Sequence, residues 1–79
     1  MNLREAKELV RQRGAEVDRE CQDPWTYVRL CVVAHGGRWY GGTGFAKRMW
    51  RDKPNPELGL EIAKGRAIAD IARQLVKEG

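Results

Sequence analysis

Hydrophobic positions in the first part of the chain recur every three to four residues, which is typical of an amphipathic helix. They are Leu3, Ala6, Val10, Val17 and Cys21. Asn2 is suited to cap the start of this helix, and Glu5 stands three positions later, where a capping box places an acid. Gly14 costs a helix interior about 1 kcal/mol relative to alanine. We therefore predict a helix over residues 3–21, with a break or kink at Gly14.

A different pattern, the two-residue alternation of a β-strand, follows over residues 25–34. Val28, Leu30, Val32 and Ala34 would share one face, and Tyr27, Arg29, Cys31 and Val33 the other. Gly36-Gly37 can supply the positive backbone angles of a two-residue hairpin turn. Residues 38–47 then form the returning strand. On it Trp39 and Phe45 share a face, and we expect both in the core.

Three glycines in the returning strand are unusual, because glycine weakens a strand unless another group must approach the backbone closely. They are Gly41, Gly42 and Gly44. Two explanations are open: a helix packed against the strand, which we favour, or a ligand at its backbone.

The last part of the chain predicts a helix over residues 56–77 after a loop at 49–55. Asn55 as cap, Pro56 at the first helical position and Glu57 in the first turn form a strong helix start. Apolar side chains cover more of this helix than one sheet face can bury. We expect the surplus to meet the first helix or another subunit.

These elements predict one domain over residues 1–79, of class α/β (α+β), in the order helix, strand, strand, helix. A chain this short buries only about 60% of the surface that its unfolded form exposes. A two-stranded antiparallel ribbon is marginal alone and leaves both edges unpaired. Pairing of two ribbons across a two-fold axis would complete the sheet, so we expect a homodimer or a higher homo-oligomer.

The net charge of +4 lies on one segment, residues 38–53, because the remaining basic and acidic residues cancel. This segment holds five basic residues, Arg38, Lys47, Arg48, Arg51 and Lys53, against the single acid Asp52. Aromatic residues lie between them. Clustered positive charge of this kind is expected where a protein meets phosphate. The basic residues just before the last helix also lie near its positive dipole end, although Asn55 and Glu57 could already satisfy that end.

Enzymatic activity is not expected. The chain has no serine, and its single histidine, His35, stands beside the turn glycines. Gly41–Gly44 are not followed by the Lys-Ser/Thr of a nucleotide-hydrolase loop. Cys21, Cys31 and His35 cannot form a four-ligand zinc site, and we predict neither metal nor cofactor. We expect the two cysteines to be reduced thiols, with a disulfide as the alternative. The capped start and the lack of an apolar run of about 20 residues favour a cytoplasmic protein without membrane contact.

Residues 42–75 resemble small actinobacterial stress proteins whose fold is similar to ribosome hibernation factors. That resemblance implies dimerisation through the sheet. Gly42, Gly44, Ala46, Lys47 and Arg48 also resemble the pattern before the last helix of double-stranded RNA-binding domains. Those domains have three strands, whereas the pattern here predicts two. Similar helices occur in short phage proteins that sequester nucleotides. This second resemblance implies a pocket between subunits, with Arg66 or the basic loop on the phosphates.

Our leading hypothesis is a non-enzymatic protein that binds RNA or the ribosome through a basic ribbon and loop surface. The phosphate contacts would come from Arg38, Lys47, Arg48, Arg51 and Lys53. Tyr40 and Trp50 are the candidates for stacking. The alternatives are a phage-encoded counter-defence protein that sequesters a small nucleotide or inhibits a host protein, and an interaction protein that meets an acidic partner.

Overall fold

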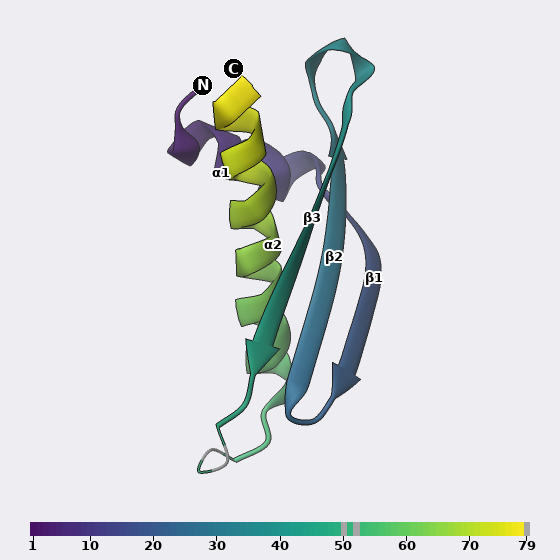
Figure 1. The fold of residues 1–79 in the computed structure, drawn as a ribbon, viewed down its shortest axis with the longest axis vertical. Coiled ribbons are helices and arrows are strands. Elements are labelled where there is room, and N and C mark those ends of the chain that lie inside the picture. The colour runs from purple at the N-terminus through teal and green to yellow at the C-terminus, as the bar shows by residue number, and fades with distance from the viewer. Residues whose placement is uncertain (50, 52, 79) are drawn as a thin grey trace.

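The computed structural model describes residues 1–49, 51 and 53–78. It has α+β architecture, with two helices and a three-stranded antiparallel sheet in the order β1-β2-β3 (Figure 1). The elements are α1 (Leu3–Arg13), β1 (Ala15–Gln22), β2 (Trp25–Val33), a short 3-10 turn (His35–Gly37), β3 (Trp39–Lys47) and α2 (Pro56–Glu78). In the part of the chain that the structure describes, no helix is long and apolar enough to span a bilayer.

The predicted first helix starts where expected but ends early. Asn2 caps it, since its side-chain oxygen accepts a hydrogen bond of 2.8 Å from the backbone N–H of Glu5. The helix ends at Arg13, and Gly14 is extended, with its N–H donating to the carbonyl of Val10 at 2.7 Å. The following residues form β1 and pair with β2. The prediction of a helix to residue 21, and hence of a two-stranded ribbon, was wrong.

The hairpin between β2 and β3 was predicted correctly, but its connection is longer than the expected two-residue turn, since residues 34–38 link the strands and include the 3-10 turn. Gly36 and Gly37 both have positive φ, 81° and 74°. Val28, Leu30 and Val32 on β2 are buried on one face. They form the core together with side chains from both helices, among them Val10 on α1 and Ile71 on α2. The core therefore lies between the helices and one face of the sheet.

The glycines of β3 permit close contact with α2, which confirms the first of the two explanations for them. A Cβ atom on Gly44 would lie 1.8 Å from the carbonyl oxygen of Ala63. One on Gly42 would lie 2.6 Å from Cγ1 of Ile71. Helix α2 also contacts α1 and β2, which accounts for its wide apolar surface. Its predicted start is correct, since Asn55 Oδ1 accepts a hydrogen bond of 3.1 Å from the N–H of Leu58.

Polar side chains of α2 cover the outer edge of β3. They are spaced four residues apart and therefore lie along one side of the helix: Arg66, Asp70 and Gln74. Arg66 Nη1 donates to the carbonyl of Phe45 at 2.5 Å, and Gln74 Nε2 donates to the carbonyl of Gly41 at 2.9 Å. The backbone N–H of Thr43 donates to Asp70 Oδ2 at 3.3 Å. Arg66, predicted to meet phosphate, thus binds a strand edge.

The other sheet edge, on β1, is protected by charge. The strand carries Glu16, Asp18, Arg19 and Glu20, and its register with β2 is irregular between Glu16 and Asp18. Charged side chains and irregular pairing are common ways in which proteins block edge-to-edge association. The dimer expected from the sequence depended on two unpaired ribbon edges. In the structure, side chains of α2 cover the edge of β3, and charged residues protect the edge of β1.

Candidate functional site

Two of the predicted phosphate-binding residues are paired within the protein. The first is Arg38, whose Nη1 lies 3.0 Å from Oε2 of Glu78 near the end of α2. Tyr40 donates its hydroxyl to the same carboxylate. The hydrogen bond from Tyr40, strengthened by the charge of Arg38, lowers the pKa of Glu78. Tyr40 is half-buried on the helix side of the sheet, beside Val32, so it is not placed as an exposed stacking surface.

The second paired residue is Arg48. Its Nε and Nη2 donate to the two carboxylate oxygens of Asp23, at 2.7 and 2.5 Å. Its backbone N–H donates to the carbonyl of Pro24 at 2.7 Å. Arg48 therefore joins the end of β3 to the turn between β1 and β2. A bidentate pair of this kind fixes geometry and removes much of the positive charge available to a ligand.

Replacing Arg48 by glutamine is expected to raise the pKa of Asp23 towards its ordinary value. The hydrogen bonds from Arg48, followed by its charge, hold that pKa low in the native protein. A carboxylate with a depressed folded pKa stabilises the fold above the unfolded pKa, about 4, and loses this effect as pH falls through the folded pKa. The stability difference between native protein and Arg48→Gln should thus shrink in acid. An NMR titration of the Asp23 carboxyl measures the shift, with Lys64→Gln as control. An unchanged midpoint in Arg48→Gln would contradict the assignment.

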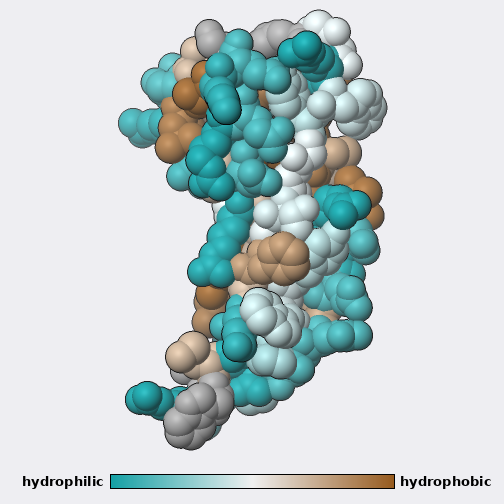
Figure 2. All heavy atoms as spheres, in the orientation of Figure 1, coloured by the Kyte–Doolittle hydropathy of each residue, from teal (hydrophilic) through white to brown (hydrophobic). Residues whose placement is uncertain are grey.

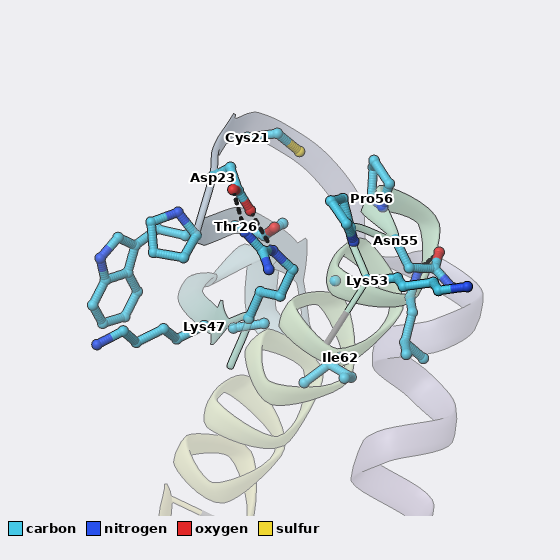
Figure 3. Close-up of a pocket in the computed structure, with 15 residues that line it drawn as sticks. Cys21, Asp23, Thr26, Lys47, Lys53, Asn55, Pro56 and Ile62 are labelled. Carbon is cyan, nitrogen blue, oxygen red and sulfur yellow. Dashed lines mark hydrogen bonds and ion pairs between the residues drawn. The ribbon is translucent and has the colours of Figure 1, made fainter. Parts of the chain in front are cut away.

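The other basic residues do not form one continuous surface. Lys47 Nζ lies 5.2 Å from the ring centroid of Trp25. Figure 3 shows Lys47 and Lys53 extending away from each other on opposite sides of a cleft. Arg51 is exposed. Trp50, a predicted stacking residue, lies outside the described residues.

The sequence prediction was wrong about which face of the sheet the aromatic side chains of β3 occupy. Trp39 and Phe45 do share a face, but it is this exposed one, and their exposed fractions are 72% and 51%. Both helices pack on the opposite face. Trp39 is paired across the strands with Val33, and Phe45 with Tyr27, so each of these two aromatic side chains lies beside its partner on the exposed face, with the two pairs six residues apart along the strands. We define the open face as Trp25, Tyr27, Arg29, Val33, Trp39, Phe45 and Lys47.

The aromatic side chains of the open face are interleaved with cations. The rings of Tyr27 and Phe45 are 5.3 Å apart between centroids and inclined at 49°. Arg29 Cζ lies 5.9 Å from the Tyr27 centroid. Trp25, under Lys47, is 50% exposed. Figure 2 shows a band of pale to brown atoms over the strands with hydrophilic atoms on both sides.

The sequence did carry a signal for this face. The second face of β2 was recognised as Tyr27, Arg29, Cys31 and Val33, of which the first two are an aromatic and a charged residue. Its first face holds the aliphatic residues that fill the core. A helix of 11 residues and one of 23 residues cover one face of a sheet and leave no element for the other. Because no helix remains to cover the second face, Trp39 and Phe45 are expected to be exposed on it.

No grouping of His, Cys, Asp and Glu suited to a metal occurs among the described residues. Cys21 and Cys31 are free thiols. Cys21 is paired with Thr26 and Cys31 with Ala15, so the two thiols lie on opposite faces of the sheet.

Comparison with known proteins adds a family and a structural relative. The crystal structure of Rv2632c is similar to this chain, with a TM-score of 0.68 and 29% sequence identity over 82% of this chain and 77% of the other. The search of curated proteins gave no match. The Rv2632c-like family profile matches residues 15–79, which include the whole sheet and α2. The chain therefore belongs to the Rv2632c-like family.

Proposed function

We propose that this protein binds single-stranded RNA across the open face of its sheet. The observation that carries the proposal is the set of exposed aromatic side chains on that face, with Arg29 and Lys47 beside their rings. Exposed aromatic rings on an antiparallel sheet stack on unpaired bases in RNA-recognition modules. Each such stack is worth about 1–3 kcal/mol and tolerates any base.

Charge on and near the open face supports the same ligand. Arg29 and Lys47 lie on the face itself, each beside an aromatic ring. Phosphates of a strand whose bases stack on the rings would lie within reach of these cations. The ion pairs of Arg38 and Arg48 make these two residues secondary to the open face.

The surface favours an unpaired strand over a duplex. Aromatic rings cannot reach base faces that are stacked inside a helix, whereas single strands present theirs. The resemblance to double-stranded RNA-binding domains, which have three strands, makes duplex RNA the necessary comparison. Ribosomal RNA, which exposes single-stranded segments, would be one source of the ligand.

A labelled oligouridine of about ten nucleotides is expected to bind at low salt and to weaken steeply as salt rises. With about three phosphate contacts, affinity should fall about 10- to 20-fold between about 50 and about 200 mM salt. Fluorescence anisotropy measures this, with a duplex of equal length as comparison. No binding at low salt, flat salt dependence, or preference for the duplex would contradict the proposal.

Homodimerisation also remains a proposal, with a different interface from the ribbon edge expected from the sequence. Since α2 covers the edge of β3, a second copy would pack on the open face and compete with RNA. Native mass spectrometry with and without the oligouridine separates the two occupants, because RNA would then convert dimers to monomers.

A further inference from the structure

A cleft of about 600 Å³ lies at the end of the molecule where β1 turns into β2 and α2 begins (Figure 3). Figure 3 shows Cys21, Asp23 and Thr26 on one side and Lys53, Asn55 and Pro56 on the other. The first turns of α2 form its floor. Ligand pockets in proteins typically measure about 300–1,000 Å³, so the cleft has room for a small organic molecule.

The floor of the cleft is formed by apolar side chains that remain partly exposed. Leu58 and Ile62, one helical turn apart on α2, line it and remain 50% and 40% exposed. Pro54 and Pro56 extend the same surface. Apolar side chains gathered in a concavity, rather than scattered on a convex surface, are typical of a ligand site.

A buried hydroxyl adds a polar group to this apolar cleft. Thr26 lines it and is the one polar side chain among the buried described residues, with 9% exposure. Its Oγ1 makes no hydrogen bond to another described residue. Gly59 makes room for it, since a Cβ there would lie 2.8 Å from this oxygen. No fully enclosed side-chain oxygen or nitrogen of the described residues lacks a partner, so this hydroxyl reaches the space of the cleft. It can therefore donate a hydrogen bond to an acceptor on a ligand.

Positive charge at the rim selects the sign of the ligand. Lys53 is exposed there, next to the start of α2, whose dipole also favours an anion. Arg48 contributes a guanidinium already shared with Asp23. The cleft thus combines an apolar floor, a hydroxyl and a cationic rim.

We propose that this cleft binds a small organic anion with a compact apolar body, of about the size of a nucleoside monophosphate. The body packs on Leu58 and Ile62, the anionic group lies at Lys53 and the start of α2, and Thr26 donates to the ligand. Trp25 and Lys47 line the cleft and also belong to the open face, whereas Phe45 and Trp39 lie outside the cleft. The proposal is argued from Thr26, Leu58, Ile62 and Lys53, which are not part of the open face, so it does not depend on RNA binding. It places phosphate recognition at Lys53, not at Arg66, whose guanidinium binds the Phe45 carbonyl.

The probe for this site is anilinonaphthalene sulfonate, an apolar anion that fluoresces when bound. Native protein is expected to bind it. Lys53→Glu should weaken binding about tenfold, as expected for loss of a charge-assisted contact. Thr26→Val keeps the side-chain shape and should weaken it about fivefold through loss of the hydroxyl. Lys64→Glu makes the same charge change at an exposed position of α2 outside the cleft and should leave binding unchanged, as should Phe45→Ala.

Competition identifies the anionic group. Displacement of the probe by adenosine monophosphate assigns a phosphate ligand, and displacement by naphthoate assigns a carboxylate. Displacement by neither compound overturns the proposal, as does equal probe binding in Lys53→Glu and Lys64→Glu. NMR shifts caused by the displacing compound must centre on Thr26, Leu58 and Ile62, and shifts confined to the open face would also overturn it. Oligouridine binding is measured separately, so either proposal can fail alone.

Discussion

Replacing Gly44 by alanine is expected to destabilise the protein by at least about 3 kcal/mol and to leave much of it unfolded. The added Cβ would lie 1.8 Å from the carbonyl oxygen of Ala63 and 2.6 Å from the backbone N of Ala67. Both are backbone atoms of α2, so no side-chain rotation relieves the overlap. The helix would have to move away from β3 and so disturb the core contacts of Ile71 and Val28.

Urea denaturation followed by circular dichroism measures this effect, and Gly65→Ala is the matched control. Gly65 lies inside α2, and a Cβ there would meet nothing within 4 Å. Alanine should therefore stabilise the helix by about 1 kcal/mol. Two substitutions of the same kind thus have opposite expected signs. A small or positive effect of Gly44→Ala would mean that α2 does not lie against this strand.

The elements that the sequence predicted correctly are those with local signals. The Asn2 cap, the two turn glycines before Arg38 and the start of α2 at Pro56 each depend on residues within about four positions of one another. The aliphatic face of β2 follows from simple alternation. These signals do not require knowledge of distant contacts, and all of them agree with the structure.

Strand β1 was missed because nothing in its own sequence demands a strand. All its residues are exposed, so it has no buried face, and Arg19 interrupts the alternation of its apolar residues Ala15, Val17 and Cys21. Val17 and Cys21 happened to continue the helical spacing of α1. What makes the segment a strand is pairing with β2, a contact between residues that are not adjacent in the sequence.

The candidate site was predicted in part for a similar reason. The basic residues of the segment are real, but the partners of Arg38 and Arg48 lie 40 and 25 positions away, at Glu78 and Asp23. Composition cannot show such pairs. The aromatic residues were assigned to a shared face correctly and to the wrong side of the sheet, because that choice depends on where the helices pack.

The double variant Trp25→Ala/Phe45→Ala is expected to lose about 30-fold or more in affinity for the oligouridine. Each ring removed from a base stack costs about 1–3 kcal/mol, and two together exceed about 2 kcal/mol. Both side chains are about half exposed and outside the buried core, so the fold should survive their removal. Lys47 would also lose its ring partner, which adds to the effect. Anisotropy titration at low salt measures the affinity, and the thermal midpoint checks the fold.

The matched control is Leu3→Ala/Ile62→Ala, which removes two partly exposed hydrophobic side chains from the helices. These residues lie off the open face, so oligouridine affinity should stay within about twofold of the native value if stacking is specific to the rings. Equal losses in both double variants would indicate a general effect of surface hydrophobicity. Full affinity in Trp25→Ala/Phe45→Ala would contradict the proposal that RNA binds to the open face, because binding would then depend on charge alone.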